Sequence, residues 1–201
     1  MPASPGLDIR PLEPALRDDY LELFEQRAFT DNPGWANCYC HFPHADHAAV
    51  EWSKRTGAEN RAAVCARIAD GRMSGWLAYV GGEAIGWCNA GPYAAVAGLF
   101  DEPEPLAARI GSIVCFVVAP AHRGHGVARA LLAAACEGLA ARGFEWAEGY
   151  PLRVEDATAA ESHFGPLALF RDAGFEEAGP VGTRRVKMRR RLAASATLGL
   201  P

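Results

Sequence analysis

The chain has 201 residues, half of them hydrophobic, and a formal net charge of −4 at pH 7. This length supports one well-formed core and is short for two domains, and the negative charge argues against attraction to nucleic acid or an anionic membrane. The first residues lack the basic start and apolar core of a secretory signal, and no apolar run reaches the roughly 18 residues of a membrane span. We therefore expect a cytoplasmic protein whose six cysteines are reduced thiols.

The N-terminal half predicts two helices and a hairpin after a first strand. Apolar residues recur at helical spacing in both helices, the second of which keeps Lys54, Arg55, Glu59 and Arg67 on its more solvated side. The pair Gly81-Gly82 between two β-like runs is a hairpin signal. In chain order we predict a strand at 7–11, helices at 13–29 and 50–71, and a hairpin of strands 76–80 and 83–89.

The segment 31–47 contains an unusual set of potential metal ligands. Five side chains of soft or borderline character fall within ten residues, so zinc or copper has to be considered. They are Cys38, Cys40, His41, His44 and His47. Their spacing fits none of the usual zinc-finger patterns, and the chain has no second paired-ligand motif. We predict no metal ligands here, and a metal-binding protein remains an alternative.

Residues 112–142 contain the strongest signal of the sequence, a buried strand followed by a glycine turn and a helix. Residues 112–118 are apolar in both alternating sets, so a strand here is covered on both faces, with Ile113, Cys115 and Val117 on one of them. From Val127 the apolar period becomes that of a helix. The turn between them, residues 123–126, holds two glycines, and helix-start amides beyond such a turn form an anion site, above all for a pyrophosphate.

The remaining chain predicts two long connections, a short helix and three strands. The connections are 91–111 and 151–165, the helix is 167–173, and the strands are 144–150, 175–178 and 183–192. Six basic residues in 184–191 fit an edge strand that charge protects from aggregation. Residues 193–201 are expected to be a frayed tail.

Two motifs in order resemble the GNAT N-acetyltransferase superfamily. Its acetyl-CoA signature, [Q/R]-x-x-G-x-[G/A], is met by Arg123, Gly126 and Ala128 after a strand ending in Val118-Ala119-Pro120. Residues 169–175, LFRDAGF, are similar to the family's L-Y-x-x-x-G-F segment. The resemblance extends over residues 6–192. It implies one α/β (α+β) GNAT domain at 1–192, with a single mixed, mostly antiparallel central sheet flanked by helices.

The resemblance implies acetyl-CoA as co-substrate and a set of residues that bind it. The backbone of strand 112–118 would hold the pantetheine arm, and the turn amides would hold the pyrophosphate. His163 occupies the position at which many relatives contact the cofactor through Asn. The implied residues are Phe116, Val117, Val118, Arg123, Gly124, His125, Gly126, Val127, Ala128, Arg129 and His163.

The sequence departs from the family pattern in its proton chemistry. Many relatives use the Tyr of L-Y-x-x-x-G-F as general acid, but this chain has Phe170 there. Tyr150 and His163 are our candidates for that role. Relatives also often place a carboxylate on the signature strand, which has none here, so Glu83, Glu148 or Glu161 would have to act as base through a water.

The resemblance also implies an acceptor and its contacts. The segment after the first helix varies among relatives to fit the acceptor, and it offers Trp35, Asn37, Tyr39 and His41. We expect an N-acetyltransferase acting on a primary amine of a small molecule or peptide by direct attack in a ternary complex. A non-catalytic acyl-CoA-binding module is the alternative. A homodimer through a terminal strand is compatible with the resemblance.

Overall fold

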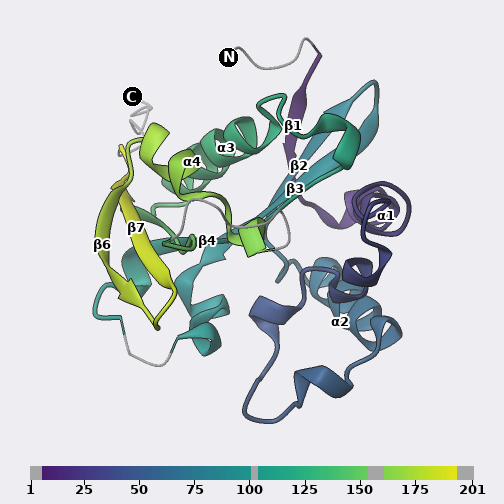
Figure 1. Ribbon diagram of the computed structural model, residues 1–201, viewed down its shortest axis with the longest axis horizontal. Coiled ribbons are helices and arrows are strands. Elements are labelled where there is room, and N and C mark those ends of the chain that lie inside the picture. Colours follow the sequence, from purple (N-terminus) through teal and green to yellow (C-terminus); the bar gives the residue numbers. More distant parts are fainter. Residues whose placement is uncertain (1–5, 101–103, 154–160, 194–201) are drawn as a thin grey trace, which may run out of the picture.

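A seven-stranded sheet runs through the molecule, in the order β1-β2-β3-β4-β5-β7-β6 (Figure 1). The computed structural model describes residues 6–100, 104–153 and 161–193. The strands are β1 (Asp8–Pro11), β2 (Gly75–Val80), β3 (Glu83–Pro92), β4 (Ile110–Val118), β5 (Trp146–Gly149), β6 (Glu176–Val181) and β7 (Arg185–Arg191). Only β4 and β5 pair in parallel among these strands, and the other neighbours are antiparallel. This mixed, mostly antiparallel sheet confirms the predicted fold class.

Helices cover both faces of the sheet. They are α1 (Arg17–Glu22), α2 (Gly57–Ala69), α3 (Val127–Ala141) and α4 (Leu167–Asp172). Helices α3 and α4 lie on one face, and α1 and α2 lie on the other (Figure 1). The alternation of strand side chains explains the two layers, because Trp76 and Ala78 of β2 pack with α3 while Leu77 and Tyr79 pack with α1 and α2. Among the described residues, no helix combines the length and apolarity needed to cross a bilayer.

Two helices differ from their predicted bounds. The predicted helix 13–29 is a short 3-10 turn, then α1, then a π-helical turn at Leu23–Arg27. The predicted helix 50–71 begins only at Gly57. Thr56 caps it, because its side chain accepts from the Glu59 amide while the Glu59 carboxylate accepts from the Thr56 amide. Residues 52–54 form a separate 3-10 turn.

The basic strand β7 is not an edge strand, which corrects the prediction from its charge. It lies between β5 and β6, so β6 is the edge. Its charges have partners instead. Arg189 binds the fully buried carboxylate of Glu148, at 2.6 Å from Nε, and also binds Glu104, which in turn accepts from Lys187 at 2.8 Å. We call Glu104, Glu148, Lys187 and Arg189 the Glu148 cluster.

Removing Arg189 should destabilise the fold in a pH-dependent way. Burial raises the pKa of Glu148 even with Arg189 beside it, and Arg189→Met would leave this carboxyl buried without its ion pair. We expect a loss of about 3–5 kcal/mol in the free energy of unfolding at pH 8. The loss should shrink toward pH 4, where Glu148 is protonated in the folded and unfolded states alike. Urea unfolding at both pH values measures it.

Two further variants control this experiment. Arg17→Met removes an exposed pair with Asp18 and should change stability little at either pH. Adding Glu148→Gln to Arg189→Met removes the stranded charge and should recover much of the loss at pH 8. An equal loss at pH 4 and pH 8 would contradict the assignment of the effect to the buried carboxylate.

Candidate active site

Strand β4 has a free edge along its second half. Its parallel pairing with β5 covers only Ile110–Ile113, whereas its pairing with β3 continues to Val118. Beyond Gly149 the chain diverges from β4 but stays beside β7, where Leu152 forms a bridge with Arg185. A Cβ at Gly149 would lie only 2.1 Å from the ring of Phe170. In the described part of the sheet, residues 114–118 therefore lack a strand neighbour on this side. Backbone amides and carbonyls placed this way need partners, so the edge can bind a polar chain.

A bulge in β4 decides which side chains reach the site. Asn89 pairs with Cys115 and Ala90 pairs with Ile113, so Val114 is an extra residue in the ladder. Cys115 consequently packs toward α1 and α2, while Ile113 packs toward α3. The sequence pattern had placed these two residues on one face, which was wrong because strict alternation ends at a bulge.

The glycine turn is shaped as an anion site. Gly124 and Gly126 have φ values of 76° and 81°, in the left-handed region that favours glycine. Gly126 caps α3, and the first helical hydrogen bond runs from the Ala130 amide to the Gly126 carbonyl. The amides of residues 127–129 therefore have no acceptor within the helix. Their direction and the helix dipole suit a phosphate group.

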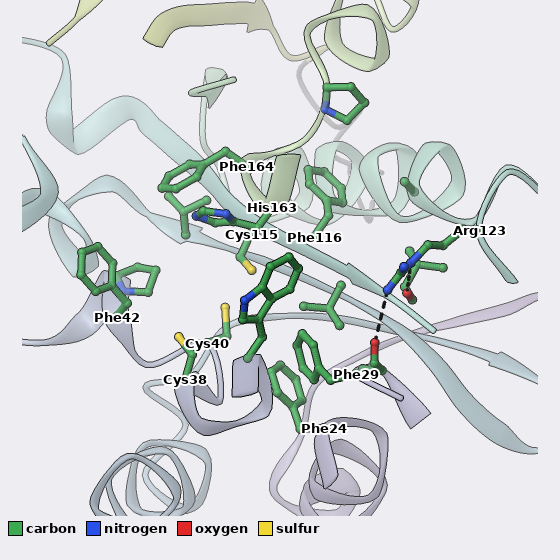
Figure 2. Close-up of a pocket in the computed structure, with 18 of the residues that line it drawn as sticks. Phe24, Phe29, Cys38, Cys40, Phe42, Cys115, Phe116, Arg123, His163 and Phe164 are labelled. Atoms are coloured by element: carbon green, nitrogen blue, oxygen red, sulfur yellow. Dashed lines mark hydrogen bonds between the residues drawn. The ribbon is translucent and has the colours of Figure 1, made fainter. Parts of the chain in front are cut away.

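A cavity of about 1120 Å³ joins the free edge and the turn to the loops beyond α1. Figure 2 shows Phe164 and His163 on one side of β4, and Phe24 and Phe29 on the other. The side of the cavity formed by β4, the glycine turn and the segments beside them is called the donor side. It is lined by Val114–Val118, His122–Gly124, Gly126–Arg129, Leu152, His163, Phe164, Pro166, Leu169, Asp172, Arg184 and Arg185. The other side, which we call the acceptor side because the predicted acceptor contacts Trp35 and Asn37 lie there, is lined by Phe24, Ala28, Phe29, Gly34, Trp35, Asn37, Cys38, Cys40, Phe42, Pro43, Trp52, Arg55 and Asn60.

Most of the predicted donor-binding residues line this cavity. Phe116, Val117, Val118, Gly124, Gly126, Val127 and Ala128 do so, and so do Arg123, Arg129 and His163. His125 does not, and its Nδ1 lies 2.8 Å from the Arg123 carbonyl. The His163 ring packs against the Phe164 ring at an interplanar angle of 53°, with 4.6 Å between the centroids.

The two arginines of the signature already have protein partners. Arg123 donates to the Val118 carbonyl at 3.0 Å and forms an ion pair with Asp31, whose pKa it lowers. This ion pair ties the loop after α1 to the signature turn. Arg129 pairs with Asp172 at 3.0 Å. Both side chains thus have acidic partners, while the backbone amides of residues 127–129 have no acceptor within the helix.

Tyr150, one of the two predicted general acids, lies away from the cavity. Its side chain is fully buried, and its hydroxyl is 2.8 Å from the Ser112 hydroxyl. Burial raises its pKa well above the usual value of a tyrosine. Phe170 is also fully buried, against Phe116 and Phe175. The residue at the usual Tyr position thus belongs to the core.

The predicted bases also lie elsewhere. Glu83 is exposed and pairs with Arg27, and Glu148 is buried against Arg189. The side chain of Glu161 is outside the described residues. Among the described residues that line the cavity, Asp172 is the only acid.

The predicted acceptor contacts divide into two pairs. Trp35 and Asn37 line the cavity, whereas Tyr39 and His41 do not. The backbone explains the division, because Tyr39 and Cys40 have φ values of 46° and 50°, and two left-handed residues in succession reverse the chain. Tyr39 then donates to Glu25, and His41 becomes buried, which lowers its pKa to about 4.

Three thiols lie along the cavity, a feature that sequence reasoning treated as packing or metal ligation. They belong to Cys38, Cys40 and Cys115, and Figure 2 shows the last two facing each other. The Asn89 amide group donates to Cys40 Sγ at 3.2 Å and to His44 Nε2 at 2.9 Å. In the described chain, no group of three or more His, Cys, Asp or Glu side chains is placed to hold a metal ion.

Sequence reasoning also missed Phe42, Trp52 and Arg55, all of which line the cavity. Arg55 was assigned to the solvated side of a helix that in fact begins two residues later. The T-x-x-E pattern of Thr56–Glu59 is the signal that could have placed it correctly, before the helix and on the loop.

Comparison with known proteins agrees with this geometry. The Acetyltransferase (GNAT) family model matches residues 14–149. No curated protein matches the sequence. Three solved structures have the same fold. The GNAT domain of S. lividans PAT has a TM-score of 0.57 at 19% identity, with 92% of this chain and 89% of that chain covered. A GCN5-related N-acetyltransferase from Kribbella flavida has a TM-score of 0.55 at 22% identity, with 94% of this chain and 100% of that chain covered. The yncA protein from Salmonella typhimurium, solved with its cofactor acetyl-CoA, has a TM-score of 0.54 at 17% identity, with 95% of this chain and 96% of that chain covered.

The family model matches well over half of the chain, and the fold and the glycine turn are those the motifs implied. The predicted family is therefore confirmed, together with the predicted class of enzyme and its acetyl donor. This chain belongs to the GNAT family and is an acetyl-CoA-dependent acetyltransferase.

Proposed function

We propose that this enzyme transfers the acetyl group of acetyl-CoA to a primary amine by direct attack within a ternary complex. One observation supports this above all. The cavity that contains the free edge of β4 and the start of α3 continues into the space beside Trp35, Trp52 and Arg55. Donor and acceptor can thus be present together, in contact, without either leaving first.

The chain's own groups fit the donor in two places. The amides of residues 127–129, beside the glycine turn, suit the pyrophosphate. The unpaired backbone of residues 114–118 suits the amide-containing pantetheine arm. A thioester carbonyl lying along this edge would be polarised by a backbone amide, which stabilises negative charge on its oxygen as the amine attacks.

The acceptor amine has to arrive neutral or lose its proton to water. Asp172 is the only acid among the described lining residues, and it is paired with Arg129. Several arginines line the same cavity, and nearby positive charge favours the neutral form of an amine. We infer that the site lowers the pKa of the bound ammonium group rather than supplying a carboxylate base.

His163 is the better placed of the two candidates to protonate the departing thiolate. It is exposed and lines the cavity, whereas Tyr150 is buried and hydrogen-bonded to Ser112. A general acid must reach the atom that receives its proton. We therefore propose His163 for this role.

Gly126→Val should weaken acetyl-CoA binding. Gly126 has φ of 81°, and a left-handed conformation costs about 1–2 kcal/mol for an L-residue, more for a β-branched one. The turn should shift and misplace the α3 amides. We expect the KM for acetyl-CoA to rise about tenfold or more, measured by thiol release at saturating amine and by calorimetric titration.

Gly143→Val is the matched control. Gly143 has φ of 85°, has open space around its missing Cβ, and follows the opposite end of the same helix. The backbone strain is the same, but the turn is untouched, so the KM for acetyl-CoA should not change. Equal donor affinity in folded Gly126→Val and wild-type protein would argue strongly against the proposed donor site.

His163→Gln and Tyr150→Phe test the assignment of the general acid. His163→Gln should lower kcat by about 100-fold or more. Because His163 also lines the donor side of the cavity, the KM for acetyl-CoA should rise as well, but by a smaller factor. Tyr150→Phe should leave kcat unchanged and lower stability by about 1 kcal/mol, because Ser112 loses its partner. The reverse pattern would transfer the role to Tyr150.

A non-catalytic acyl-CoA-binding module is the second candidate, and the burial of Phe170 favours it because this residue has no hydroxyl to offer. Steady thiol release with any amine, beyond the slow hydrolysis of acetyl-CoA alone, would exclude it. Saturable binding with no release from any amine would support it.

A further inference from the structure

The arginines that line the cavity differ in how they are engaged. Arg123 pairs with Asp31, and Arg129 pairs with Asp172. The Arg185 guanidinium lies 3.4 Å above the Phe164 ring, and Arg184 also has a protein partner. Arg55 alone lines the acceptor side, beyond α1. Within the described chain its side chain makes no ion pair, and the one hydrogen bond of that side chain is donated by Nε to Asn60 Oδ1 at 2.7 Å.

Asn60 holds the Arg55 guanidinium in a fixed direction. The Asn60 side chain is almost fully buried, and its Nδ2 donates to the Asn37 carbonyl at 2.9 Å. Both ends of this carboxamide are therefore used, one by Arg55 and one by the loop. Because the described side-chain contacts of Arg55 engage only Nε, its two terminal nitrogens remain available to a ligand of the cavity that Arg55 lines. Two parallel N–H groups of this kind match a carboxylate.

The surroundings of Arg55 are aromatic. Trp52 packs edge-on against Phe42, with centroids 5.0 Å apart, and both line the cavity. Trp35 also lines it and is 38% exposed, the one large hydrophobic side chain left exposed in the described chain. An exposed aromatic surface in a cavity is typical of a place where an apolar group binds.

Among the described residues, no acid lines the acceptor side. Asp172, the only acid among the described lining residues, lies on the donor side and is paired. The histidines of the loop do not change this picture, because burial lowers the pKa of His41 and of His44 to about 4 and leaves them neutral at pH 7. A polyamine or an aminoglycoside would bring several positive charges with no carboxylate to bind them.

We propose that the acceptor is a small primary amine with an aromatic or bulky apolar body and a carboxylate, which Arg55 binds. This inference rests on the proposed N-acetyltransferase function and names its substrate class. Arg55 would orient the acceptor by its anionic end while Trp35, Trp52 and Phe42 contact its apolar body. The amine would then point toward the free edge of β4.

A comparison of matched acceptors tests the proposal. Thiol release from acetyl-CoA is followed with three amines: L-phenylalanine, L-phenylalaninamide and spermidine. L-phenylalaninamide has nearly the same shape as L-phenylalanine but lacks the negative charge of the carboxylate. We expect kcat/KM for L-phenylalanine to exceed that for the amide by about 10- to 100-fold, and spermidine to be the poorest. Equal or better use of the amide or of spermidine would overturn the proposal.

Variants of Arg55 tie the preference to this residue. Arg55→Met should lower kcat/KM for L-phenylalanine by about 10- to 100-fold and leave the amide nearly unchanged, and Arg55→Lys should recover only part of the loss. The amide reaction in the same variant reports that the protein is folded and competent. Arg61→Met is the control, because Arg61 lies on α2, pairs with Glu25 and does not line the cavity.

The outcomes separate this proposal from the function on which it rests. If Arg55→Met instead raises the KM for acetyl-CoA, Arg55 serves the donor and the proposal fails. If the variant treats both acceptors as the wild type does, the substrate class is wrong while N-acetyl transfer stands. If no amine supports thiol release although acetyl-CoA binds, the proposed function fails. Calorimetric titration of N-acetyl-L-phenylalanine against its amide then decides the Arg55 site without turnover, and equal affinities would overturn it.

Discussion

The site depends on a single constraint, the divergence of β4 and β5 after only four paired residues. Parallel strands normally stay paired, since each unpaired amide or carbonyl requires another partner. Here the Phe170 ring packs directly beneath Gly149, where any side chain would collide with it. The packing of Phe170 thus accompanies the separation of β4 from β5. This separation exposes the β4 backbone, which a donor can bind.

The acceptor side of the cavity, opposite this opening, is held in place by polar contacts, several of which join segments far apart in the sequence. Arg123 joins the signature turn to Asp31, about 90 residues earlier in the chain. Asn89 bridges His44 and Cys40, and Asn60 bridges Arg55 and Asn37. Buried amide groups that use both of their ends are strongly oriented. The loop between α1 and α2, although it has little regular structure, can therefore present a defined surface to an acceptor.

The distribution of charge has a structural origin as well. The chain is acidic overall, but the acids near the sheet are committed elsewhere, as in the Glu148 cluster, where two carboxylates meet Lys187 and Arg189. Among the described residues that line the cavity, there are several arginines and a single acid, Asp172, which is paired. Under the proposed function, such a site would favour an anionic thioester donor and a neutral amine, and it would disfavour polycations. Net charge therefore says little about the ligand, because a local field depends on which charges have partners.

The sequence by itself determined the family, the order of most elements and the glycine turn before α3, because these rest on local signals. Apolar periodicity, the glycine pair of the hairpin and the turn at 123–126 each act within a few residues, and the backbone amides of the turn are present whatever the side chains nearby. Tertiary structure alone decided the bulge at Val114, the interior position of β7, the burial of Tyr150 and the place of Arg55. Each of these depends on which distant segment packs against the residue, and no local spacing encodes that choice.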